Sequence, residues 1–150
     1  MNRNHYPRLL LMAALSFMAM FALMYAMVDA LDNVYVNINQ FYMAGLMTAP
    51  MIVIELALMG AMYENKMLNA VIVAVSIAAL ILFWVLIRGQ VAVSDRQFLK
   101  SMIPHHASAL LMCKETPVKD PAVKALCKRI LSSQEAEIRE MKELLRKTDS

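Results

Sequence analysis

Hydrophobic residues fill three long stretches in the first part of the chain, and beyond them they recur every three or four positions among polar residues. The three stretches cover about residues 9–28, 41–62 and 68–87. Each is close to the ~20 residues that a helix needs to cross the hydrocarbon core of a bilayer. The first and third contain no charged residue, and the second contains Glu55. This pattern predicts three membrane-spanning helices within a membrane region of residues 1–88.

The first stretch has an alternative interpretation as a signal peptide, because Val28-Asp29-Ala30 resembles a cleavage site. Its apolar run is longer than the ~7–15 residues usual in such peptides, so we expect a span. Apolar residues make up 60% of the chain, against roughly 45–50% in soluble domains. The composition therefore also favours a protein of the lipid bilayer.

Basic residues flank the three spans unevenly. The N-terminal tail carries Arg3 and Arg8 and the second connection carries Lys66, whereas the charges of residues 29–40 are all acidic. The positive-inside rule then predicts a cytoplasmic N-terminus and a C-terminal part outside. The many basic residues of the C-terminal part argue the other way, but whole domains cross membranes largely regardless of charge. We predict a multi-pass protein of the bacterial cytoplasmic (inner) membrane, with a periplasmic or extracellular C-terminal part.

The polar part, residues 93–148, has the signals of two helices joined by a short turn. Ser94 and Gln97 have the spacing of a capping box, which predicts a helix start and a helix ending near Glu115. Pro104 lies inside this helix, so we expect either a kink or a fresh helix start there, with the carbonyl of Lys100 left without its helical donor.

The second helix is expected from Asp120 as its cap and Pro121 at its first position, to about Lys147. Its apolar positions recur at spacings of three and four: Val123, Leu126, Cys127, Ile130, Ile138, Met141 and Leu145, with Gln134 in the same row. A short turn makes the two helices antiparallel. His105 should then face Gln134, Met102 should face Glu137, and Cys113 should lie within about a turn of Cys127.

The run from Met102 to His106 reads Met-Ile-Pro-His-His. Together with seven later positions it resembles the domain of unknown function 305 over about residues 93–147: Ala109, Met112, Leu126, Ile130, Gln134, Glu137-Ile138 and Met141. The chain has Ala107-Ser108 where that family often has Gln-Gly, and one hairpin where many members have two. The resemblance implies an all-α fold: a ferritin-like half-bundle behind a three-helix anchor, completed as a four-helix bundle by a homodimer. It also implies copper or silver handling, since some members are associated with it.

The His-His pair also suggests metal binding on chemical grounds. Imidazole binds metal when neutral, and a helix starting at Pro104 would disfavour the protonated form. Thioether and thiolate sulfur prefer Cu(I) or Ag(I) to hard ions. The candidate metal ligands come from both helices: Met102, His105, His106, Met112, Gln134, Glu137 and Met141. Adjacent helical residues point about 100° apart, so one imidazole should face the second helix, while the other faces a partner subunit or donates a structural hydrogen bond.

Alternatives remain open for the two histidines and for the two cysteines. The histidines can hydrogen-bond Gln134 and Glu137 and serve only to fix the hairpin. Cys113 and Cys127 can form a disulfide, remain buried thiols or act as soft ligands.

Methionines recur every four residues on the second predicted span, at Met43, Met47, Met51 and Met59, with Glu55 in the same series. A thioether row with a mid-membrane carboxylate is a candidate ion path. Flexible packing side chains give the same pattern, and Glu55 could be satisfied by Thr48 or Tyr63.

The sequence thus predicts a membrane-anchored binder of Cu(I) or Ag(I) in metal homeostasis or resistance, with a metal transporter or metallochaperone as its partner. The alternative is a structural module whose hairpin dimerises or docks a partner without metal. We expect no enzyme, because no Glu-x-x-His pair of a di-iron bundle is present. We expect no nucleic-acid binding, because the basic residues are dispersed.

Overall fold

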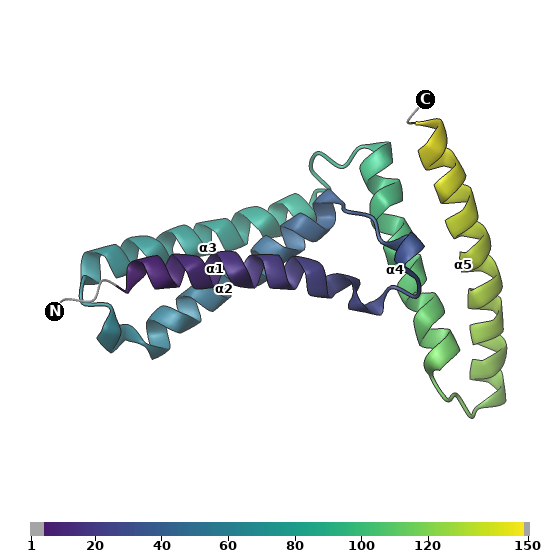
Figure 1. Ribbon diagram of the computed structural model, residues 1–150, viewed down its shortest axis with the longest axis horizontal. Helices are drawn as coiled ribbons and strands as arrows, with labels where there is room; N and C mark the ends of the chain where they lie inside the picture. Colours follow the sequence, from purple (N-terminus) through teal and green to yellow (C-terminus); the bar gives the residue numbers. More distant parts are fainter. Residues whose placement is uncertain (1–4, 149–150) are drawn as a thin grey trace. The chain divides into compact units, whose positions relative to one another are not determined.

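The computed structural model describes residues 5–148, and every regular element in that range is helical. The long helices are α1 (Tyr6–Leu23), α2 (Ile38–Leu58), α3 (Lys66–Arg88), α4 (Asp95–Glu115) and α5 (Pro121–Lys147) (Figure 1). Short 3-10 helices are η1 (Met24–Met27), η2 (Leu31–Asn33) and η3 (Gly60–Met62). The predicted all-α class is confirmed. Arg3, used above to orient the chain, lies outside the described residues.

The chain divides into two compact units. One contains α1 and residues 39–91, and the other contains residues 24–38 and the chain from Ala92 onward. From the sequence we assigned residues 24–38 to the membrane region, and in the structure this connection clusters with the C-terminal hairpin.

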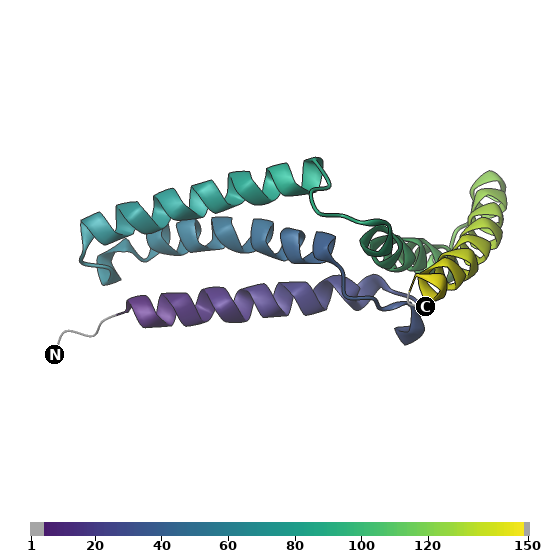
Figure 2. The ribbon, with the colours of Figure 1, turned by 90° about the horizontal axis from the view of Figure 1, so that it is seen from above.

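In the first unit, α1, α2 and α3 run alongside one another in both views (Figures 1 and 2). The Phe17 and Phe41 rings meet edge to face, with centroids 5.1 Å apart, between α1 and α2. The ring of Phe83 on α3 occupies the space that a side chain at Gly45 on α2 would fill. Three segments are long and apolar enough to cross a membrane: Tyr6–Met27, Ile38–Leu58 and Lys66–Arg88.

In the second unit, α4 and α5 pack side by side and antiparallel, as the short turn predicts (Figures 1 and 2). Their core is formed by seven buried residues: Leu99, Ile103, Ala107, Leu110, Ile138, Met141 and Leu145. Val28 and Tyr35 pack against this core from the connection that precedes α2. The connection thus covers part of the hairpin.

The helix ends follow the predicted signals, with one exception. The side chain of Asp120 accepts hydrogen bonds from the amides of Ala122 and Val123, which caps α5. Ser94 caps α4 through the amide of Gln97 at 3.4 Å. Gln97 Oε1, however, accepts from the amide of Ile38 at 2.9 Å. The Gln97 side chain, expected to complete a capping box with Ser94, therefore bonds the first residue of α2.

Pro104 neither ends nor restarts a helix, because α4 is continuous from Asp95 to Glu115. Asn37 Nδ2 lies 3.4 Å from the Lys100 carbonyl oxygen, which Pro104 cannot serve. His105 and His106 consequently lie in the middle of a long helix. The effect of a helix N-terminus on their charge, expected from a fresh start at Pro104, does not operate there, because it falls off within the first turn.

Candidate functional site

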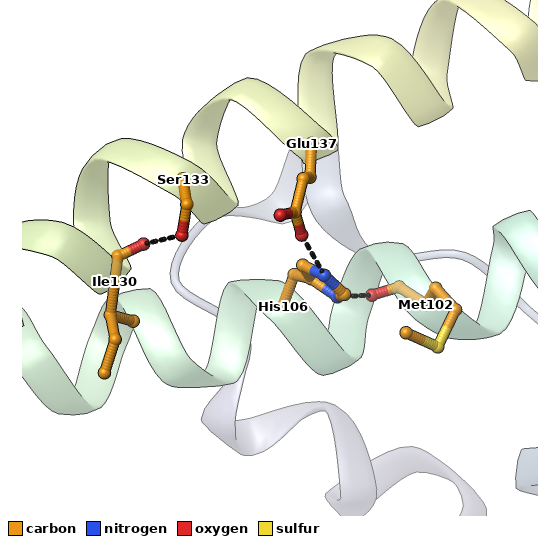
Figure 3. A network of polar contacts seen from close by, with 5 residues as sticks. All are labelled: Met102, His106, Ile130, Ser133 and Glu137. Atoms are coloured by element: carbon orange, nitrogen blue, oxygen red, sulfur yellow. Dashed lines mark hydrogen bonds and ion pairs between the residues drawn. The ribbon is translucent and has the colours of Figure 1, made fainter.

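His106 joins the two helices of the hairpin (Figure 3). Its Nε2 lies 2.7 Å from Glu137 Oε2 on α5, and its Nδ1 lies 3.0 Å from the carbonyl oxygen of Met102, one turn earlier on α4. The imidazole is largely buried, with 13% of its side chain exposed, whereas Glu137 is half exposed. Side chains on a helix lean towards its N-terminus. This lean explains why His106, rather than Met102, meets the carboxylate that we placed opposite Met102.

The two partners of His106 decide what its ring can do. A backbone carbonyl only accepts, so Nδ1 must donate to Met102. An ionised Glu137 also only accepts, so Nε2 must donate to it as well. If Glu137 carries the proton instead, it donates to Nε2 and occupies the remaining lone pair. In either form His106 offers no lone pair to a metal while these two bonds persist.

His105 faces outward. It is exposed, its ring centroid is 6.1 Å from that of His106, and no hydrogen-bond partner for it appears among residues 5–148. As helix geometry leads one to expect, one imidazole faces the second helix and the other does not.

The other predicted ligands are also spread over the hairpin. Met141 is 9% exposed within the core, and Met102 packs against that core. Met112 is 49% exposed on the outer surface. Gln134 Oε1 is buried without a hydrogen-bond partner and does not reach His105. In the part of the chain that the structure describes, no cluster of three or more His, Cys, Asp and Glu side chains is suited to a metal ion.

Cys113 and Cys127 lie together near the turn of the hairpin, as the register predicts. Both are free thiols, so of the alternatives left open for them the disulfide is not formed in this structure. A hydrogen bond with Cys127, together with burial, raises the pKa of the Cys113 thiol above its ordinary value. The two residues line an open pocket of about 270 Å³.

The methionine row of α2 lies largely on the outside of the first unit. Met43, Met47 and Met59 are exposed, while Met51 and Glu55 are partly buried. A single copy of this unit therefore does not enclose the row as a path. Glu55 Oε1 accepts a hydrogen bond from the hydroxyl of Tyr63 at 3.4 Å, one of the partners we expected for it.

Sequence reasoning missed the polar contacts between the first connection and α4. Lys114 Nζ lies 3.6 Å from Asp29 Oδ2 and 3.5 Å from Glu135 Oε1. Asn37 is buried and bonds the carbonyls of Tyr35 and Lys100. The cluster of Asp and Asn between two apolar stretches was a usable signal, since these residues commonly serve backbone groups in loops.

The structure has three apolar helices, which are candidate membrane spans, and a two-helix hairpin. A histidine–carboxylate bond joins the two helices of the hairpin. Together these features define a class of helical protein. The chain belongs to the family described as "Domain of unknown function (DUF305)", whose model matches residues 54–145. The match confirms the resemblance and begins earlier than we expected, because it includes the end of α2 and all of α3. The helical structure is consistent with a ferritin-like helical domain.

The chain is also similar to an uncharacterized protein of Acanthamoeba polyphaga mimivirus. The two are 34% identical over 140 residues, which cover 91% of this chain and 90% of the viral one. No solved structure matches the chain significantly. The viral relative extends the likeness over the candidate spans as well as the hairpin.

Proposed function

We propose that this protein is a membrane-anchored binder of soft metal, Cu(I) or Ag(I), in metal homeostasis or resistance. The observation that carries the proposal is the outward imidazole of His105, which is exposed and has no hydrogen-bond partner within the described range. A neutral imidazole in that position has a lone pair available for a metal. The exposed thioether of Met112 lies seven residues further on, two turns along the same face of α4.

His105 and Met112 are about 10 Å apart along the helix axis, which is too far for one ion to be held by both. A second copy of the hairpin would complete a ferritin-like four-helix bundle and could bring another imidazole or thioether close to each. We therefore propose that the metal-binding form is a homodimer.

The three candidate spans are proposed to cross the bilayer. Most side chains of α1 and α3 are exposed although they are apolar, which suits helices surrounded by lipid. We retain the proposed orientation, with the N-terminus in the cytoplasm and the hairpin on the periplasmic or extracellular side. The methionine row of α2 faces outward, so it remains a candidate ion path only where two copies of this chain meet.

A Cu(I) titration of the full chain in detergent tests the metal proposal, with both cysteines changed to serine so that thiols do not contribute. We expect His105→Ala and Met112→Leu to weaken binding by at least about tenfold, since loss of even an outer-shell partner costs roughly 10–100-fold. Met67→Leu is the matched control, because Met67 is an exposed methionine of the other unit. Equal affinity in the His105→Ala variant and its parent would contradict the proposal.

The second candidate function is a docking or dimerisation module that binds no metal. It is favoured by apolar side chains left exposed near the turn of the hairpin, namely Val123, Leu126 and Met112. It also explains the His106–Glu137 bond as a fixed structural contact. A chain that binds no Cu(I) but forms a dimer disrupted by Leu126→Glu would support this module over the metal-binding protein.

A metal transporter or metallochaperone remains the proposed partner in the metal-binding case.

A further inference from the structure

The thiols of Cys113 and Cys127 face one another across the α4–α5 hairpin, close to the turn. Each comes from a different helix, Cys113 from α4 and Cys127 from α5. They lie on the wall of an open pocket of about 270 Å³, which the turn residues Thr116 and Pro117 help to form. A small ion can therefore reach both sulfurs from solvent.

Two lysines line the same pocket. Lys124 and Lys128 are four residues apart on α5 and so lie on one face of it, together with Cys127. No carboxylate lines this pocket. The side-chain charge of the pocket is therefore positive. A positive pocket stabilises a bound group whose net charge is negative.

We propose that Cys113 and Cys127 form a second soft-metal site, in which a monovalent d¹⁰ cation such as Cu(I) is held by two thiolates. Binding releases one proton from each thiol and forms two metal–sulfur bonds, with no change of oxidation state. The product carries a charge of −1, from two thiolates and one monovalent cation. Lys124 and Lys128 offset this charge.

The number of ligands available at this site decides which metal ion fits it. Zinc in structural sites takes four ligands, but no third His, Cys, Asp or Glu joins these thiols in the part of the chain described. Thiolates prefer soft ions such as Cu(I). A pair of sulfurs on facing helices thus suits a two-coordinate soft monovalent ion. This site does not depend on His105, which lies two turns away from Cys113 along α4.

The test is a Cu(I) titration of the reduced full chain in detergent, in competition with a bathocuproine chelator, together with X-ray absorption spectroscopy at the copper edge. In the His105→Ala/His106→Ala background, which removes the histidine site, we expect one tightly bound Cu(I) per chain with a sulfur-only shell of two ligands. Cys113→Ser and Cys127→Ser should each lower the affinity by at least about tenfold. The bound ion should also protect both cysteines of the unsubstituted protein from alkylation, a readout that does not depend on the stability of any variant.

Two controls separate this site from the one on His105. The His105→Ala/His106→Ala variant should keep the sulfur-bound ion, so that loss of the histidine site and loss of the thiol site are recognised independently. Lys124→Gln/Lys128→Gln should weaken binding and reduce its dependence on salt. Unchanged binding in both serine variants would overturn the proposal. So would a Cys113–Cys127 disulfide in protein whose thiols were trapped with alkylating agent at cell lysis.

Discussion

Asn37 donates a hydrogen bond from Nδ2 to the carbonyl oxygen of Lys100, at 3.4 Å. This is the carbonyl that Pro104 leaves without a helical donor. Asn37 is buried, and it also serves the carbonyl of Tyr35. A side chain from the connection before α2 thus stabilises α4 at the Lys100 carbonyl, about one turn ahead of Pro104.

Asn37→Leu removes this donor while nearly keeping the side-chain volume. We expect it to lower the free energy of unfolding by about 1–3 kcal/mol, the usual cost of a buried polar group left unpaired. In a Pro104→Ala background the loss should be smaller, because residue 104 then supplies the missing amide. Chemical unfolding of the four proteins in detergent, followed by circular dichroism, measures this double-mutant cycle. Equal losses in both backgrounds would disprove the link between Asn37 and Pro104.

The His106–Glu137 bond is expected to contribute little to stability by itself. Glu137 is half exposed, and ion pairs accessible to solvent contribute about 0–1 kcal/mol. Glu137→Gln should therefore reduce the free energy of unfolding only slightly, and less in the presence of His106→Ala. Glu140→Gln, an exposed change on the same helix, is the control. A loss of several kcal/mol on Glu137→Gln would contradict this expectation, because it would exceed what an ion pair accessible to solvent contributes.

Gly45 is needed for the contact between α2 and α3. A Cβ atom at this position would overlap the ring of Phe83, so Gly45→Ala should destabilise the first unit by about 1–3 kcal/mol, as overpacking commonly does. Gly60→Ala is the matched control, since a Cβ there meets no neighbour within 4 Å. Thermal unfolding in detergent measures both variants. Partial recovery in Gly45→Ala/Phe83→Leu would identify the ring as the cause.

The reactivity of Cys113 should depend on Cys127. The hydrogen bond with Cys127, and to a lesser degree burial, raises the pKa of the Cys113 thiol, so less of it is thiolate at a given pH. Because the thiolate is the nucleophile, alkylation by iodoacetamide should become fast only at higher pH than for an ordinary thiol. Cys127→Ala removes the main cause, and the rate profile should shift to lower pH. Mass spectrometry assigns the modified residue, and a shift to higher pH would show that the hydrogen bond has the opposite effect.

Much of the fold could be predicted from local sequence signals. The three apolar stretches, the cap at Ser94, and Asp120 followed by Pro121 each describe a helix or its end. Each depends on interactions within a few residues, so neighbours in the chain are sufficient to specify it. The approach of Cys113 to Cys127 also followed, because a short turn between two helices leaves little freedom in their register.

The contacts of the candidate site were harder to predict because they depend on residues far apart in the chain. Nothing near Pro104 shows that Asn37 will satisfy the Lys100 carbonyl, and without that contact a fresh helix start was a reasonable expectation. The sequence also could not show that His106 would use both ring nitrogens within the hairpin and leave His105 outside.

The sequence by itself determined the helical class, the helix ends, the family motif and the chemical character of the candidate ligands, because composition and spacing carry these directly. Tertiary structure alone decided which ligands meet. Residues 24–38 return to cover α4, the lean of the His106 side chain brings it to Glu137, and Met141 is taken into the core while Met112 is left outside. These outcomes depend on how side chains compete for the limited space and hydrogen-bonding groups between packed helices, and that competition is settled only when distant segments come together.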